Sequence, residues 1–163
     1  MCIRDSWTRL TDSGLSIVEW KPLTGMIPPF SSEGWIVEFE KYKSIPEFKL
    51  VNFDITMDEF KFIYWWEWGH RQLARIIGLV WFVGFFILWI TKQIPERWTL
   101  YFFGIGLLGA LQAFLGWWMV SSGLDGQVVD VFSYRLAIHL TMAFIILALI
   151  FWAILFHSEN SAK

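Results

Sequence analysis

Two of the three histidines lie inside or shortly before long apolar stretches of the sequence. His70 precedes a stretch that begins at Ile76, and His139 lies inside the stretch from 136 to 156. Ionisable side chains at membrane depth are costly and usually serve a function. A neutral imidazole is a good ligand for iron, and two histidines on facing helices can hold a heme between them. His70 and His139 are therefore candidate ligands of a heme iron.

Three arginines lie close to these histidines. Arg135 comes four residues before His139 and shares its helical face, one turn nearer to water, and Arg71 and Arg75 follow His70 closely. Heme propionates need cations at the edge of the membrane, so these arginines are candidate propionate partners. A histidine that only packs and forms hydrogen bonds remains the alternative for each of the pair.

Glu67 comes three residues before His70 and four before Arg71, so it shares a helical face with both. Its carboxylate could take part in chemistry beside the iron ligand, or it could form a structural ion pair with the arginine. The spacing leaves both interpretations open.

The composition indicates a membrane protein. Hydrophobic residues make up 56% of the chain and aromatic residues 20%, and the mean hydropathy is +0.48. The net charge of -2 and the lack of a long basic run predict no nucleic-acid partner. Cys2 is the single cysteine, which excludes an internal disulfide and any multi-cysteine metal site within this chain.

Three stretches have few or no charged residues, and two of them reach the roughly 20 residues that span a bilayer. The first is shorter, but the capping box from Thr56 to Glu59 starts a helix that can run through His70 to about Ile90. We therefore predict an all-α integral membrane chain with three transmembrane helices. Their expected ranges are 56–91, where an interfacial extension precedes the span, 98–121 and 134–156.

The remaining segments are expected to lie outside the membrane. Residues 1–55 contain four prolines, several charges and no long apolar run, so they are predicted to form an extramembrane loop or small cap. Residues 1–7 are interpreted as a truncated or non-native start. Residues 157–163 are expected to form a tail, with His157 in solvent.

The direction of the chain predicts the depth of the two histidines. The first and third helices run the same way across the membrane. His70 lies about 20 residues before the end of its helix, and His139 lies about 17 residues before the end of its own, so their depths agree within about 5 Å. Both imidazoles are therefore expected in one layer of the membrane.

Four stretches carry a resemblance to a known family: Thr8–Ser16 with Val18–Pro22, Trp66–Arg71, Leu111–Gln112 with Gly116–Leu124, and Tyr134–Leu140. Together they resemble heme A synthases, the membrane enzymes that convert heme O to heme A for cytochrome oxidase. They follow the family order and cover most of the chain. The loop lacks the cysteine pair of some bacterial members, so the mitochondrial and alphaproteobacterial branch is most similar.

The resemblance implies eight transmembrane helices in two four-helix halves, each half with a histidine pair for a heme. This chain would supply the second to fourth helices of the first half and the extramembrane loop before them. The first helix and the second half would be missing, so we expect this chain alone to be inactive.

The resemblance also assigns roles to residues. His70 and His139 would bind the heme of the first half, and Glu67 would be the acidic residue needed for oxidation of a heme methyl group to a formyl group. Heme O would be the substrate and heme B the resident cofactor of the intact enzyme. The implied partners are a ferredoxin-like electron donor, heme O synthase and further copies of the chain, in the bacterial or mitochondrial inner membrane.

Two other functions remain open from the residues. A bis-histidine b-type cytochrome would bind heme for electron transfer without altering it. A heme-free assembly or transport module would use the histidines structurally. Gln112, in the middle of the second helix, fits either a role at the heme or a hydrogen bond between helices. The pairs Gly106 with Ala110 and Gly109 with Ala113 are spaced to let a neighbouring backbone approach closely.

Overall fold

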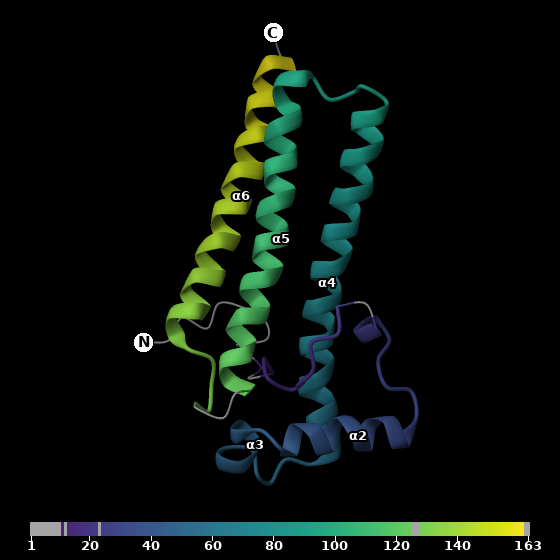
Figure 1. The fold of residues 1–163 in the computed structure, drawn as a ribbon, viewed down its shortest axis with the longest axis vertical. Coiled ribbons are helices and arrows are strands. Elements are labelled where there is room, and N and C mark those ends of the chain that lie inside the picture. Colours follow the sequence, from purple (N-terminus) through teal and green to yellow (C-terminus); the bar gives the residue numbers. More distant parts are fainter. Residues whose placement is uncertain (1–10, 12, 23, 125–127, 162–163) are drawn as a thin grey trace. The chain divides into compact units, whose positions relative to one another are not determined.

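The computed structural model describes residues 11, 13–22, 24–124 and 128–161, and helices are the regular elements of this part of the chain (Figure 1). The predicted truncated start at residues 1–7 lies outside it. The chain divides into a first unit, Met1–Arg75 with Trp117–Phe132, and a second unit, Ile76–Gly116 with Ser133–Lys163. The elements are η1 (Thr24–Met26), α2 (Ser32–Lys43), α3 (Pro46–Leu50), α4 (Met57–Ile90), α5 (Glu96–Leu124) and α6 (Ser133–Ser161).

The long helix α4 begins where the capping box predicts. The backbone N–H and the hydroxyl of Thr56 donate to Glu59 Oε2 at 2.8 and 2.7 Å, and the Glu59 N–H donates to Thr56 Oγ1 at 3.3 Å. These bonds satisfy N–H groups that have no partner inside the helix. This helix start is confirmed.

The described segment before α4 contains the α-helices α2 and α3 and the short 3-10 helix η1, whereas the sequence predicted an extramembrane loop or small cap without specifying helices. Ser31 caps α2 by accepting a 3.0 Å hydrogen bond from the Gly34 N–H. Pro46 occupies the first turn of α3, where the missing N–H of proline costs nothing. A proline in the interior of a segment usually indicates a loop. A proline in the first turn, such as Pro46, can instead mark the start of a helix.

Aromatic side chains of α2 pack on the first turns of α4 and form the core of the first unit. The Phe60 ring lies 4.9 Å from the Phe39 ring and 5.3 Å from the Tyr42 ring, measured between centroids. This core holds the extramembrane segment on the beginning of α4. Its buried members are Leu15, Phe39, Tyr42, Ile45, Phe60, Ile63 and Tyr64.

Three of the helices are long and apolar enough to cross a membrane: α4, α5 and the part of α6 from Ser133 to His157. Even 29 residues of helix exceed the roughly 30 Å of a hydrocarbon core at 1.5 Å per residue. Their apolar side chains are largely exposed within this chain. The predicted fold class, an all-helical chain with three membrane-spanning helices, is confirmed.

In the second unit, α5 and α6 are joined by a hydrogen bond and by aromatic contacts. The Tyr101 hydroxyl donates to the Leu149 carbonyl at 2.7 Å, and the buried Trp98 ring lies 4.7 Å from the His157 ring. His157 lies inside α6, which continues to Ser161 because no glycine or proline ends it earlier. The tail expected from residue 157 is thus largely helical in the described part.

Glycine in α5 allows one close contact with α4 inside the second unit. A Cβ atom on Gly106 would overlap the Trp81 ring, whereas a Cβ on Gly109 would have no atom of another described residue within 4 Å. At Gly106 the close contact is made by a side chain of α4 and not by its backbone, so the expected approach of a neighbouring backbone stays a prediction. It is not observed at Gly109 among the described residues.

Candidate functional site

Glu67 lies in the part of α4 that belongs to the first unit, and its carboxylate is held by four hydrogen bonds. The residue is 3% exposed. Oε2 accepts from the Ser16 hydroxyl at 2.7 Å and from the Ile17 N–H at 2.8 Å, and Oε1 accepts from Arg71 Nη2 at 2.6 Å and Nε at 3.1 Å. The ion pair with Arg71 that the spacing suggested is therefore present. A buried carboxylate of this kind is stable because each oxygen has charged or strong donors.

Arg71 also binds the segment 13–22, which we call the strap. Its Nη2 donates to the Ile17 carbonyl at 2.9 Å and its Nη1 to the Glu19 carbonyl at 3.1 Å. With the two bonds to Glu67, four of the five guanidinium N–H groups are used. Arg71 thus joins α4 to the strap through both charge and geometry.

Arg75 binds the end of the strap one helical turn later. Its Nε donates to the Pro22 carbonyl at 2.9 Å, Nη2 donates to the Lys21 carbonyl at 3.0 Å, and Nη1 donates to Gln72 Oε1 at 3.1 Å. A Cβ on Gly25 would come within 3.2 Å of Nη2, so the glycine leaves room for the guanidinium. Two of the arginines predicted as propionate partners therefore hold backbone carbonyls of the strap.

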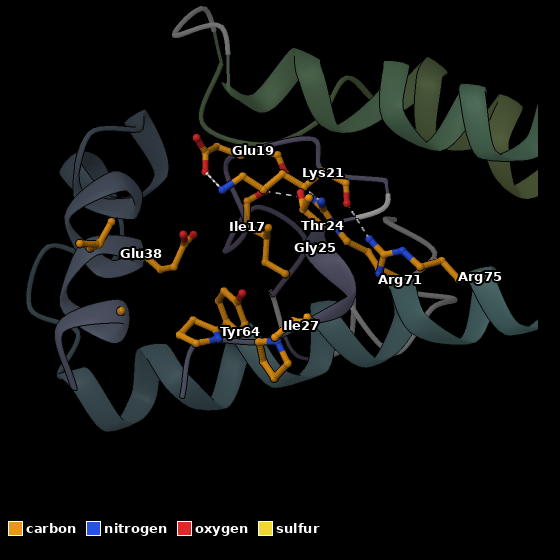
Figure 2. Close-up of a pocket in the computed structure, with 14 residues that line it drawn as sticks. Ile17, Glu19, Lys21, Thr24, Gly25, Ile27, Glu38, Tyr64, Arg71 and Arg75 are labelled. Carbon is orange, nitrogen blue, oxygen red and sulfur yellow. Dashed lines mark hydrogen bonds and ion pairs between the residues drawn. The ribbon is translucent and has the colours of Figure 1, made fainter. Parts of the chain in front are cut away.

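A pocket of about 340 Å³ lies between the strap, α2 and α4 within the first unit (Figure 2). Its walls carry both signs of charge: Arg71 and Arg75 on α4, and Glu19 with Lys21 on the strap. Glu19 Oε2 lies 2.6 Å from the Nζ atoms of both Lys21 and Lys41. These hydrogen bonds, from Lys21 and then Lys41, hold the pKa of the Glu19 carboxyl below its usual value.

His70 follows Glu67 on α4 and is exposed in this chain. His70 belongs to the first unit, together with Glu67, Arg71 and Arg75. Its imidazole is sterically accessible to a ligand.

His139 lies in α6 and contacts α5 inside the second unit. Gln112 Nε2 lies 3.1 Å from the His139 carbonyl oxygen, to which it donates, and 3.3 Å from the imidazole Nε2. A Cβ on Gly116 would come within 2.9 Å of His139 Cε1. Any residue larger than glycine would therefore displace the imidazole ring from its position. The half-buried imidazole is therefore bounded by two residues of one face of α5.

Arg135 lies one turn before His139 on α6, as its spacing predicts. Its Nε donates to the hydroxyl of the adjacent Tyr134 at 3.2 Å, and its guanidinium lies 5.8 Å from the centre of that ring. Arg135 is half-buried. It is the one predicted propionate partner that belongs to the second unit with His139.

The structure therefore groups the predicted residues in two sets. Glu67, Arg71 and Arg75 meet at the strap, and Arg135 lies beside His139. Because His70 and His139 belong to different units, their pairing at one membrane depth stays a prediction.

Sequence reasoning missed two features of these sets. One is the part played by Ser16 and the backbone of Ile17 in holding Glu67. The other is the contact of Gly116 with His139. A glycine one helical turn after the polar Gln112 is the signal that could have indicated the second feature.

Comparison with known proteins gives the family. The family model described as cytochrome oxidase assembly protein matches residues 5–163. Three relatives are named heme A synthase, from Dinoroseobacter shibae (60% identical over 91% of this chain), Paracoccus denitrificans (55% over 95%) and Cereibacter sphaeroides (50% over 100%). The chain spans 39%, 41% and 42% of the length of these relatives, respectively.

No solved structure matches the chain. The family model nevertheless covers nearly every residue, including the strap, Glu67 and both histidines. The chain therefore belongs to the cytochrome oxidase assembly protein family.

Proposed function

We propose that this chain forms part of a heme A synthase, a membrane enzyme that oxidises a methyl group of heme O to the formyl group of heme A. The observation that carries this proposal is the 50–60% identity to proteins of that name over 91–100% of the chain. The activity is proposed for a longer protein, since the chain spans 39–42% of these relatives.

The proposed reaction consists of two hydroxylations of one methyl carbon and a loss of water. Each hydroxylation removes two electrons from the carbon and inserts one oxygen atom of dioxygen. The other oxygen atom leaves as water, formed with two protons and two electrons from a ferredoxin-like donor. The resulting geminal diol, –CH(OH)₂, loses water to leave –CHO. The atoms balance, because –CH₃ with two oxygen atoms gives –CHO and H₂O.

His70 and His139 are the proposed imidazole ligands of the heme iron. A heme ligand needs a neutral ring nitrogen with a free lone pair and room beside the ring. The exposed position of His70 supports such a role. At His139, the support is the space that Gly116 leaves for the ring and the contact of Gln112 with Nε2. A bound heme would supply the redox chemistry, and the protein would hold and orient it.

Glu67 is the proposed acidic residue of the oxidation. A carboxylate one helical turn from an iron ligand can orient water or stabilise a developing positive charge. Burial and four hydrogen bonds fix the Glu67 carboxylate, which supports an electrostatic role. A carboxylate has about four acceptor positions, so accepting a proton would first require the release of one of these bonds.

The three arginines differ in what they can offer a heme propionate. Arg71 has one guanidinium N–H left after its bonds to Glu67 and the strap, and Arg75 has two. Arg135 bonds to the neighbouring Tyr134. We therefore propose Arg75, which has two N–H groups left, and Arg135, which lies one turn before His139, as propionate partners. Arg71 divides its four hydrogen bonds between Glu67 and the strap.

The remaining expectations follow from the same assignment. The protein would lie in the inner membrane of a bacterium or mitochondrion, with heme B as the resident cofactor of the intact enzyme. Heme O synthase would supply the substrate, and assembly with further copies of the chain is expected.

A chimera tests the proposal. This chain replaces the matching part of the Paracoccus denitrificans relative, to which it is 55% identical over 155 residues. The chimera is expressed in a strain without its own heme A synthase, and extracted hemes are separated by chromatography. Heme A is expected with the chimera and is expected to be lost in its His70→Ala and His139→Ala variants.

Two outcomes overturn the proposal. A chimera that accumulates in the membrane at the parent's level without heme A contradicts it, and bound heme without conversion would instead support an electron carrier. Heme A in the strain without the chimera would show that another protein makes it. A second chimera with the Cereibacter sphaeroides relative, aligned over all 163 residues, covers a failure of the first to accumulate.

A further inference from the structure

The side chain of Gln112 makes an unusual pair of contacts with one residue of the neighbouring helix. Its Nε2 atom lies 3.1 Å from the backbone carbonyl oxygen of His139 and 3.3 Å from the imidazole Nε2. An amide NH₂ group carries two hydrogens, so one can point to each of these atoms. Gln112 thus contacts both the backbone and the ring of His139.

The backbone contact determines which way the amide of Gln112 faces. If the amide were turned around, its oxygen would face the His139 carbonyl oxygen, and two acceptors would meet. The nitrogen therefore faces His139. A neutral imidazole that accepts this contact at Nε2 carries its lone pair there and its proton on the buried Nδ1 atom.

The other end of the amide shows that this arrangement has a cost. Gln112 Oε1 is buried and has no hydrogen-bond partner among the described residues. An unsatisfied polar atom between apolar helices destabilises the fold. An apolar residue would pack here without that penalty, so helix packing alone is a poor reason for a glutamine at this position.

Gly116 bounds the same ring one helical turn further along α5. A Cβ at this position would lie 2.9 Å from His139 Cε1 and 3.4 Å from Nδ1, which is closer than side chains normally approach. Gly109 lies on the same helix, and a Cβ there would have no atom of another described residue within 4 Å. The lack of a side chain at Gly116 therefore matters for the ring.

We infer that Gln112 and Gly116 form a positioning site on α5, which holds the His139 imidazole in the tautomer and orientation that present the Nε2 lone pair. The inference rests on the proposed function for its purpose, because that lone pair is what a histidine offers to iron. Iron binding at Nε2 would replace the 3.3 Å contact and leave the 3.1 Å contact to hold Gln112 in place.

The tautomer can be measured without heme. The full chain is prepared in detergent with isotope-labelled histidine, and the NMR shifts of the imidazole nitrogens report which one is protonated. Variants of the other two histidines, His70→Gln and His157→Gln, assign the signals. We expect protonated Nδ1 in His139 of the unaltered chain and a mixture of tautomers in Gln112→Met, which removes the amide at similar volume.

Two matched controls separate positioning from general packing. Tyr101→Phe also removes a hydrogen bond between α5 and α6, from the Tyr101 hydroxyl to the Leu149 carbonyl, but away from the histidine. Gly109→Ala adds the same methyl group as Gly116→Ala, but into open space. Both controls are expected to leave the His139 signals unchanged.

A hemin titration followed by absorption gives the second measurement. Gln112→Met and Gly116→Ala are expected to weaken hemin binding about three- to tenfold, the effect of one lost hydrogen bond or a small displacement. The control variants are expected to bind as the unaltered chain does. A shifted heme absorption band in the two test variants would show the altered ligand orientation directly.

The outcomes distinguish this inference from the proposed function. Protonated Nε2 in the unaltered chain, or His139 signals and hemin binding unchanged in both test variants, overturns the positioning site. A tautomer that depends on Gln112 supports the positioning site even where the chain alone binds no hemin, whereas the proposed function fails if the chimera makes no heme A.

Discussion

The Ser16 hydroxyl donates a 2.7 Å hydrogen bond to Oε2 of Glu67, a residue 51 positions later in the chain. Both side chains are buried, with exposed fractions of 1% and 3%. Together with the Ile17 N–H and the Arg71 guanidinium, this bond attaches the strap to α4.

Loss of the Ser16 hydroxyl should loosen the strap. In Ser16→Ala, a hydrogen bond to a buried carboxylate is lost, which should destabilise the strap by about 1–3 kcal/mol. Hydrogen exchange at the Ile17 amide measures the effect. Ser44→Ala is the control, since it removes an exposed hydroxyl that donates to the Lys41 carbonyl in the same unit. Equal exchange in both variants would contradict the structural role of Ser16.

Arg71 cannot be replaced by lysine if it holds the strap as described. A lysine keeps the charge but cannot reach Glu67 and the carbonyls of Ile17 and Glu19 together, because it lacks the planar fork. We expect Arg71→Lys to destabilise the strap by about 2 kcal/mol and to expose it to protease. Arg97→Lys, at an exposed arginine, should have no such effect. If the strap of Arg71→Lys resists protease as well as that of the unaltered chain, a positive charge alone is sufficient to hold it.

Acid should weaken the first unit through Glu19. Its carboxyl has a lowered pKa in the folded chain because Lys21 and Lys41 donate hydrogen bonds to it. Its contribution to stability is complete above the pKa of the unfolded chain and is lost as the pH falls through the folded-state value. Comparing thermal unfolding of the unaltered chain and Glu19→Gln from neutral to acidic pH isolates this contribution. The difference in unfolding temperature between the two chains should become smaller in acid. A difference that is constant with pH would contradict the contribution of Glu19.

Substitution of Gly106 by alanine should destabilise the chain, whereas the same substitution at the nearby Gly104 should not. A Cβ on Gly106 would overlap the Trp81 ring, while a Cβ on Gly104 would have no atom of another described residue within 4 Å. Gly106→Ala should therefore destabilise the second unit by about 1–3 kcal/mol. Gly104→Ala should stabilise it by up to about 1 kcal/mol, because alanine favours helix. Thermal unfolding in detergent compares the two, and equal effects would show that Trp81 moves aside freely.

The features that could be predicted from the sequence are local ones. The capping box of Thr56 and Glu59 and the ion pair of Glu67 with Arg71 join residues three or four positions apart, where helix geometry sets the distance. The three long helices follow from apolar runs of sufficient length.

The contacts that could not be predicted depend on the tertiary fold. The Ile17 N–H is a backbone group, and no residue type indicates that it will meet Glu67. Arg71 was expected at a heme edge because of its charge, yet two of its four hydrogen bonds go to the strap and the other two to Glu67. Charge and spacing predict where a cation lies along a helix, but the partner depends on which distant segment folds against it.

The strap makes a sharper test of Glu67 possible in the chimera. We expect Glu67→Ala to retain heme binding and to lose conversion of heme O, measured by absorption and by chromatography of extracted hemes. The same variant also releases the Ser16 and Ile17 bonds, so a loss of conversion could come from the strap. Ser16→Ala loosens the strap but keeps the carboxylate. If Ser16→Ala still converts heme O and Glu67→Ala does not, the loss belongs to the carboxylate. If both variants lose the same conversion and show the same hydrogen exchange in the strap, Glu67 is a structural residue.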